Sequence, residues 1–251
     1  MNHKDLFSAH AQSYAQYRPS YPPALFQYLA ETCKKHECAW DCATGNGQAA
    51  LALTASFKKV IATDLSPEQL DQAVKHPQIT YRQATAEQST LDDHSVSLVT
   101  VAQALHWFKL EAFFREVTRV LEPQGVLAVW SYALNSVAPE IDRIMLAYYN
   151  GTIGPYWEPE RALVEEGYAS VQLPPRFEEL KVPTFHMEQT WNLQQYLGYL
   201  RTWSATRKAM KVLGHDPLDA HLEEWAKAWG PADAKRVVRF PLAVRVAVYA
   251  G

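Results

Sequence analysis

The chain has 251 residues, 48% of them hydrophobic, and its 24 lysines and arginines against 27 aspartates and glutamates give a formal net charge of −3. This length and composition exclude disordered and fibrous proteins and suit one globular α/β domain covering residues 1–251. Because the sequence has no long basic run, a nucleic-acid surface is not expected, and the predicted partner is a small molecule.

The cysteines and the apolar segments indicate a compartment. No segment has the roughly 18 apolar residues of a membrane span, and residues 1–17 lack the apolar core of a secretory signal. Cys33, Cys38 and Cys42 cannot all pair as disulfides, which is typical of a reducing compartment. With His36 they could form a zinc site, but the spacing is irregular, and packed, reduced thiols are preferred. We therefore expect a cytoplasmic monomer or homodimer with no metal and no membrane contact.

Helical and strand-like segments alternate in the first part of the chain. In chain order, the predicted elements are helices at 5–17 and 22–36, a strand at 38–43, a helix at 47–57 and a strand at 59–64. Pro22 and Pro23 suit a first helical turn, and Ser66 with Gln69 is a capping pair that begins the next helix.

The same alternation continues and then changes. The next predicted elements are strands at 79–83, 95–103 and 125–133 and a helix at 110–121. After Asn135, the predicted elements are helices at 138–150, 158–168, 191–211 and 217–229 and strands near 177–187 and 236–249. The alternation predicts a parallel, doubly wound sheet, and the last third predicts two further strands with helical insertions.

The segment WDCATGNGQ (40–48) joins the first predicted strand of the sheet to a helix, where backbone N–H groups can bind a ligand. Gly45 and Gly47 permit a sharp turn and a close ligand approach, but they suit dinucleotides equally well. Asp41 would repel a pyrophosphate and attract an ammonium group. Asp64 ends the second strand, where it can accept hydrogen bonds from ribose hydroxyls. The two acids favour a nucleoside with a cationic tail, such as S-adenosylmethionine, over NAD.

Over most of residues 5–133 the sequence resembles class I S-adenosylmethionine-dependent methyltransferases, and more narrowly the branch that contains trans-aconitate methyltransferases. The stretches that carry the resemblance are YAQYRPSYP (14–22), WDCATGNGQ (40–48), ATDLSPEQL (62–70), VAQALHWF (101–108) and, more weakly, YLRTWSA (199–205). The resemblance implies a Rossmann-like seven-stranded sheet, mostly parallel with an antiparallel last strand and flanked by helices. It divides the chain into an N-terminal helical cover (1–36), a cofactor-binding core (37–134) and remaining strands with a helical lid (135–251).

The resemblance also implies which residues bind the methyl donor, S-adenosyl-L-methionine. The implied set is Tyr14, Arg18, Asp41, Ala43, Thr44, Gly45, Gly47, Asp64, Leu65, Ala86, Glu87 and Gln103. In this set Asp64 would hold the ribose, Leu65 would lie against the adenine, and Gln103 would lie near the sulfonium. Two positions depart from the family pattern. Thr85 replaces a common aspartate, which weakens the expected adenine contact, and at Ala43, where glycine is common, the added methyl group is expected to exclude a positive φ.

His106 and Trp107, which follow the fourth core strand, are the predicted catalytic residues. Since imidazole titrates near neutrality, His106 could serve as a general base for an amine or hydroxyl, whereas a carboxylate would need none. The residues predicted to face the substrate are Tyr17, Phe108, Arg201 and Trp203. The predicted reaction is methyl transfer to a small molecule, with a carboxylate as first choice. The alternatives are a noncatalytic S-adenosylmethionine-binding module and an NAD-dependent oxidoreductase.

Overall fold

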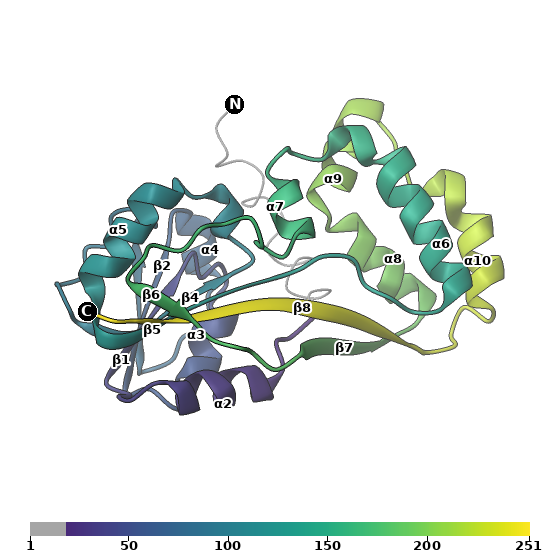
Figure 1. Ribbon diagram of the computed structural model, residues 1–251. Coiled ribbons are helices and arrows are strands. Elements are labelled where there is room, and N and C mark those ends of the chain that lie inside the picture. Colours follow the sequence, from purple (N-terminus) through teal and green to yellow (C-terminus); the bar gives the residue numbers. More distant parts are fainter. Residues whose placement is uncertain (1–18) are drawn as a thin grey trace.

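A computed structural model describes residues 19–251, and Figure 1 shows their arrangement. The predicted helix at 5–17 and the candidate site residues Tyr14, Tyr17 and Arg18 lie outside these residues.

The strands of the described part form a single sheet. They are β1 (Cys38–Cys42), β2 (Lys59–Asp64), β3 (Ile79–Gln83), β4 (Val96–Ala102), β5 (Leu121–Tyr132), β6 (Phe177–Glu179), β7 (Phe185–Trp191) and β8 (Arg236–Tyr249). Their order across the sheet is β3-β2-β1-β4-β5-β8-β6, and β7 also pairs with β8. Strands β1 to β5 run parallel, and the last strand of the chain, β8, runs antiparallel to β5. The mostly parallel sheet with an antiparallel last strand is confirmed.

The outer position of the sheet differs in detail from the prediction. Two strands, β6 and β7, pair with successive parts of the long β8, where one strand near 177–187 is predicted. Pro183 lies in the gap between them, and its nitrogen carries no hydrogen for a ladder bond. The sheet therefore has seven positions across its width, and eight strands fill them.

The helices are shorter than their sequence patterns. They are α2 (Pro23–Thr32), α3 (Gln48–Leu53), α4 (Pro67–Asp71), α5 (Leu110–Val120), α6 (Pro139–Ala147), α7 (Arg161–Glu165), α8 (Leu193–Arg201), α9 (Ser204–Leu213) and α10 (Leu222–Trp229). Short 3₁₀ or π turns occupy Leu105–Trp107, Tyr148–Thr152, Gly154–Tyr156 and Asp219–His221. The predicted single helix at 191–211 is wrong: it is interrupted at Trp203, whose backbone is extended with ψ 137°.

Two apolar cores lie on the two faces of the sheet. Alternate residues of β1 face opposite sides, so that Ala39 joins the core of α2 and α3, and Trp40 joins the core of α5. The first core continues into a helical cap, which we define as α6, α8, α9 and α10. Figure 1 shows this cap at one end of the molecule, reached by the long strand β8.

Candidate functional site

The carboxyl ends of β2, β1 and β4 lie side by side, because these parallel strands are neighbours in the sheet. In the register of the sheet, Cys42 at the end of β1 is opposite Thr63 of β2 and Val101 of β4. The loop after β1, the end of β2 and the turn after β4 therefore meet at one edge. This edge brings together the predicted residues Asp41, Asp64 and Gln103, as expected for ligand sites in parallel α/β sheets.

The loop after β1 makes a sharp turn that depends on left-handed backbone conformations. Ala43, Gly45 and Gly47 all have positive φ, at 54°, 57° and 83°. The Thr44 N–H donates to the carbonyl oxygen of Thr63 at 2.9 Å, which fastens the loop to β2. The expectation that alanine excludes a positive φ at position 43 is wrong. An L-residue can occupy the left-handed region at a cost of about 1–2 kcal/mol, and the surrounding hydrogen bonds hold it there.

Gly47 has a steric role as well as a conformational one. A Cβ at this position would lie 2.3 Å from the hydroxyl oxygen of Tyr81, a residue of β3. That hydroxyl donates to the carbonyl oxygen of Val74 at 2.8 Å, which fixes the tyrosine against the loop. The loop passes so close to β3 that only glycine fits without a shift.

Asp41 lies beneath the loop and not on its surface. It is 1% exposed, and its two carboxylate oxygens accept hydrogen bonds from the hydroxyls of Thr44 at 2.5 Å and Thr100 at 2.7 Å. Burial raises its pKa to about 6, although the hydroxyls and the backbone N–H of Ala50 act in the opposite direction. An attraction between Asp41 and a cofactor cation would therefore act across the loop through a medium of low polarity.

Asp64 organises the edge from the end of β2. Its carboxylate oxygens accept the backbone N–H groups of Gly45 at 2.8 Å and Ser66 at 2.9 Å. Burial raises its pKa, and these two N–H groups oppose the rise. Each oxygen keeps a lone pair for a further donor, as ribose recognition requires. Leu65, the next residue, is apolar and 46% exposed, as expected for a surface that can cover an adenine ring.

The remaining predicted cofactor residues have structural partners. Ala86 is buried, and the carboxylate of Glu87 accepts the Lys109 N–H at 2.9 Å, where α5 begins. The side-chain amide of Gln103 exchanges hydrogen bonds with the backbone of Tyr132, at 3.0 Å as donor and 2.8 Å as acceptor. Glu87 and Gln103 thus brace the edge, and their side chains have fewer atoms available to a ligand than the sequence suggests.

His106 lies in the short turn after β4, with its ring centroid 4.7 Å from that of Trp107. Its Nδ1 is 3.0 Å from the hydroxyl oxygen of Tyr168, a residue 62 positions away in the chain. Burial, together with the charge of Arg161, lowers the pKa of His106 to about 3. This pKa lies well below the near-neutral reference value of imidazole, because burial and the positive charge of Arg161 both disfavour the protonated ring. At neutral pH the ring is uncharged and a weak base.

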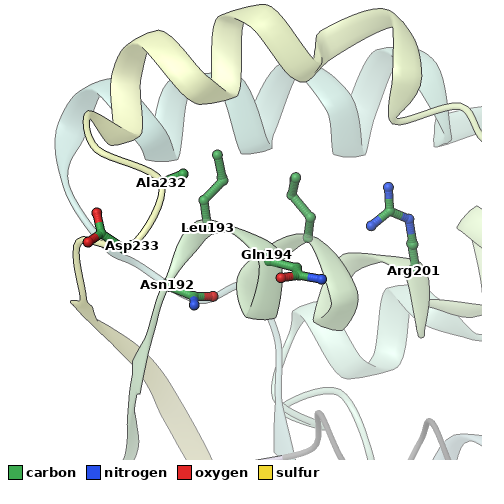
Figure 2. A pocket seen from close by; sticks show the side chains of 7 residues that line it. Asn192, Leu193, Gln194, Arg201, Ala232 and Asp233 are labelled. Carbon is green, nitrogen blue, oxygen red and sulfur yellow. The ribbon is translucent and has the colours of Figure 1, made fainter.

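Three of the predicted substrate residues have other surroundings. The ring of Phe108 packs against buried Phe113 at 4.9 Å, within the core beneath α5. Arg201 donates to the carboxylate of Asp216 at 2.6 Å. It lines a surface cavity of about 400 Å³, shown in Figure 2, which no residue of the strand edge lines. Trp203 is 7% exposed and packs among other aromatic side chains. In the structure, Arg201 therefore lies away from the edge, and Trp203 is a core residue.

Arg161, at the start of α7, is a residue that sequence reasoning missed, and its charge acts on His106. Its guanidinium lies 4.8 Å from the centroid of the Trp157 ring, and its Nε donates to the Tyr149 hydroxyl at 2.9 Å. Its Nε also lies 4.0 Å from a carboxylate oxygen of Glu165, and no hydrogen bond from its Nη atoms is present among residues 19–251. The Trp157 and Tyr149 rings pack in turn against Trp203, so core aromatic side chains hold the guanidinium whose charge acts on His106. No local motif marks an arginine whose role depends on folding.

Comparison with known proteins gives the family. Residues 40–129 match the model of a methyltransferase domain. A candidate methyltransferase of Dictyostelium discoideum is 34% identical over 233 residues, which cover 91% of this chain and 88% of the relative. The solved structure of a candidate type II methyltransferase from Anaeromyxobacter dehalogenans superposes with a TM-score of 0.86 at 40% identity, covering 92% of this chain and 97% of that one.

The chain belongs to the class I S-adenosylmethionine-dependent methyltransferases. It is therefore an enzyme, which replaces the alternatives of a noncatalytic module and an oxidoreductase. A candidate S-adenosylmethionine-dependent methyltransferase of Saccharomyces cerevisiae is 33% identical over 138 residues, 51% of this chain and 46% of that protein. The relatives named here are not described as trans-aconitate methyltransferases, so the narrower resemblance stays a prediction.

Two further features of this methyltransferase concern metals and membranes. Within residues 19–251, no three His, Cys, Asp or Glu side chains gather in a way that could hold a metal ion. The thiols of Cys33 and Cys42 are buried, and burial raises the pKa of Cys33 to about 12. In the same part of the chain, no helix combines the length and apolar character that crossing a membrane requires.

Proposed function

We propose that this methyltransferase transfers the methyl group of S-adenosylmethionine to an oxygen of a small-molecule carboxylate. The observation that carries the donor assignment is Asp64, whose carboxylate is fixed by Gly45 and Ser66 beside the exposed Leu65. A ribose and an adenine ring need such a pair of neighbouring surfaces, one acidic and one apolar.

The loop residues fit a ligand with a cationic tail. The nearest described heavy atom to a Cβ built on Gly45 is the Oε1 of Gln69, at 3.8 Å, so a ligand can approach the backbone there. Asp41 supplies negative charge beneath the loop, and its carboxylate accepts a hydrogen bond from the hydroxyl of the loop residue Thr44. We assign the methionyl end of the donor to this loop, with Tyr14 and Arg18 as further candidates.

Methyl transfer requires the protein only to position the two reactants and to exclude water. When bound, S-adenosylmethionine supplies a methyl group on sulfur, and the bond to sulfur breaks as an acceptor oxygen bonds to the carbon, leaving the electron pair on sulfur. A carboxylate is already ionised at neutral pH, so no protein group needs to remove a proton. The residues need only align the acceptor oxygen at about 3 Å from the methyl carbon.

The low basicity of His106 and the Nη atoms of Arg161, whose Nε lies 4.0 Å from Glu165, support an anionic acceptor. His106 is a weak base there, which disfavours hydroxyl or amine acceptors that must lose a proton to it. The Nη atoms of Arg161 can donate two parallel hydrogen bonds, the arrangement that suits a carboxylate. We therefore assign Arg161 to the acceptor, in place of Arg201.

Two measurements test the proposal. Calorimetry with S-adenosylmethionine, S-adenosylhomocysteine and NAD should show binding of the first two only, and tight NAD binding would contradict the donor assignment. Incubation with a labelled methyl donor and a panel of small acids, amines and phenols should label acids. Labelling confined to amines or phenols would leave the donor assignment intact and overturn the acceptor class.

A further inference from the structure

Tyr168 reaches the site from a tightly constrained turn after α7. Gly167 and Tyr168 both have positive φ, at 60° and 63°. A Cβ on Gly167 would lie 2.5 Å from the Cβ of Ala243, so this turn packs directly on β8. A positive φ is a true outlier for a residue as large as tyrosine, and such a conformation persists only where the surroundings enforce it.

Arg245 of β8 provides that enforcement. One Nη of its guanidinium donates to the carbonyl oxygens of Tyr168 at 2.6 Å and Val171 at 2.7 Å. The same guanidinium is held by the two carboxylate oxygens of Glu179, at 2.6 Å and 2.9 Å. The turn is thus clamped to the sheet, and the fully buried Tyr168 side chain has a fixed direction.

That direction places the Tyr168 hydroxyl against His106. The hydroxyl oxygen is 3.0 Å from Nδ1, and the two rings are nearly parallel, with an interplanar angle of 23°. The backbone N–H groups of Leu105 and His106 also face this oxygen and act to lower the pKa of the phenol, although burial raises it overall. Since N–H groups approach the oxygen, its own hydrogen is free to point at Nδ1.

We infer that Tyr168 is a positioning residue that donates to Nδ1 of His106 and fixes the histidine with its hydrogen on Nε2. In neutral imidazole only one nitrogen carries a hydrogen, so an accepting Nδ1 leaves Nε2 as a donor. No partner for Nε2 is present among residues 19–251. His106 then offers a hydrogen bond to an oxygen of the acceptor and does not take a proton from it. This inference deepens the proposed function and rests on it for the identity of the acceptor.

The tautomer can be measured without any substrate. In protein labelled with ¹⁵N-histidine, long-range ¹H–¹⁵N correlation distinguishes a hydrogen on Nε2 from one on Nδ1. We expect His106 to carry its hydrogen on Nε2 in the wild type, and Tyr168→Phe to populate both tautomers. The matched control is Tyr196→Phe, which removes another buried hydroxyl, one bonded to Asn135, and should leave His106 unchanged. A hydrogen on Nδ1 in the wild type, or an unchanged tautomer in Tyr168→Phe, overturns the inference.

Activity separates donation from proton removal. His106→Gln keeps an N–H donor near the position of Nε2 but cannot accept a proton, so it should retain activity within about tenfold, whereas His106→Leu should lose about 100-fold in kcat/KM. Tyr168→Phe should lower kcat/KM about tenfold and leave the Kd for S-adenosylhomocysteine unchanged. A His106→Gln variant as inactive as His106→Leu contradicts donation. If the wild type binds no S-adenosylhomocysteine at all, the proposed function fails, while the tautomer measurement still decides the role of Tyr168.

Discussion

The loop after β1 and the region around His106 occupy the same edge of the sheet but are built differently. The loop is a contiguous segment whose backbone is tied to β2, and its acids come from two neighbouring strands. The His106 region joins side chains that are distant in sequence, such as Tyr168, 62 positions away. One short sequence motif can form the binding site of a ligand that all members of a family share. A site for an acceptor that differs between members uses residues from the rest of the chain. Four variants probe this difference.

Gly47→Ala should have the largest effect and act on the donor side. The new Cβ would collide with the Tyr81 hydroxyl and occupy a φ of 83°, so the loop or the tyrosine must move. We expect the affinity for S-adenosylmethionine to fall about 30- to 100-fold, measured by calorimetry. Gly151→Ala is the control, because a Cβ there meets no described atom within 4 Å. Unchanged affinity in Gly47→Ala would show that the loop conformation does not define the donor site.

Asp41→Asn should weaken donor binding about tenfold at pH 7 and yet stabilise the free protein. Its folded pKa of about 6 exceeds the ordinary value of 3.8, so between these values the folded state binds more protons than the unfolded state. The contribution of Asp41 to stability is thus present at low pH and is lost as pH rises through this window.

The variant lacks this titration, so its advantage in free energy of unfolding should grow from pH 4 to pH 6, to about 1 kcal/mol or more. Denaturant unfolding of both proteins across that range measures it. Wild-type binding of S-adenosylmethionine should also weaken below about pH 6, as Asp41 becomes protonated. An advantage that shrinks with rising pH would mean that Asp41 is stabilised as a carboxylate by a group not identified in this site.

Arg161→Gln should act on the acceptor side alone. Loss of the guanidinium should raise KM for a carboxylate acceptor about tenfold and leave the Kd for S-adenosylhomocysteine unchanged. Arg239→Gln, which removes a surface arginine paired with Glu188, is the control and should change neither value. Equal losses in donor and acceptor binding would contradict the separation of the two regions.

Ala43→Gly should have the smallest effect. Glycine relieves the cost of a φ of 54° but adds freedom to the unfolded chain, so the net gain in stability should be about 0.5 kcal/mol. Thermal unfolding measures the change, and Ala52→Gly within helix α3 should instead destabilise the protein. A loss of stability in Ala43→Gly would mean that the alanine methyl group contributes more through packing than its backbone conformation costs.

How well each segment of the fold could be predicted depended on how regularly its apolar residues are spaced. The core strands β1 to β5 could be placed from short apolar segments because a buried parallel strand has few other ways to cover its side chains. The cap was less predictable. A single apolar pattern over 191–211 could not show that Trp203 interrupts the helix to pack among four aromatic rings. Tertiary packing there overrides helix propensity.

The sequence by itself determined the family, and it predicted the donor loop and the edge of the sheet at which the site is proposed to form. Those features depend on neighbours within a few residues and on the alternation of strands and helices. Only the tertiary structure decided that Arg201 pairs with Asp216, and that burial and the charge of Arg161 lower the pKa of His106. The physical reason is that burial and long-range contacts set protonation and charge pairing, and neither is encoded in the spacing of a local motif.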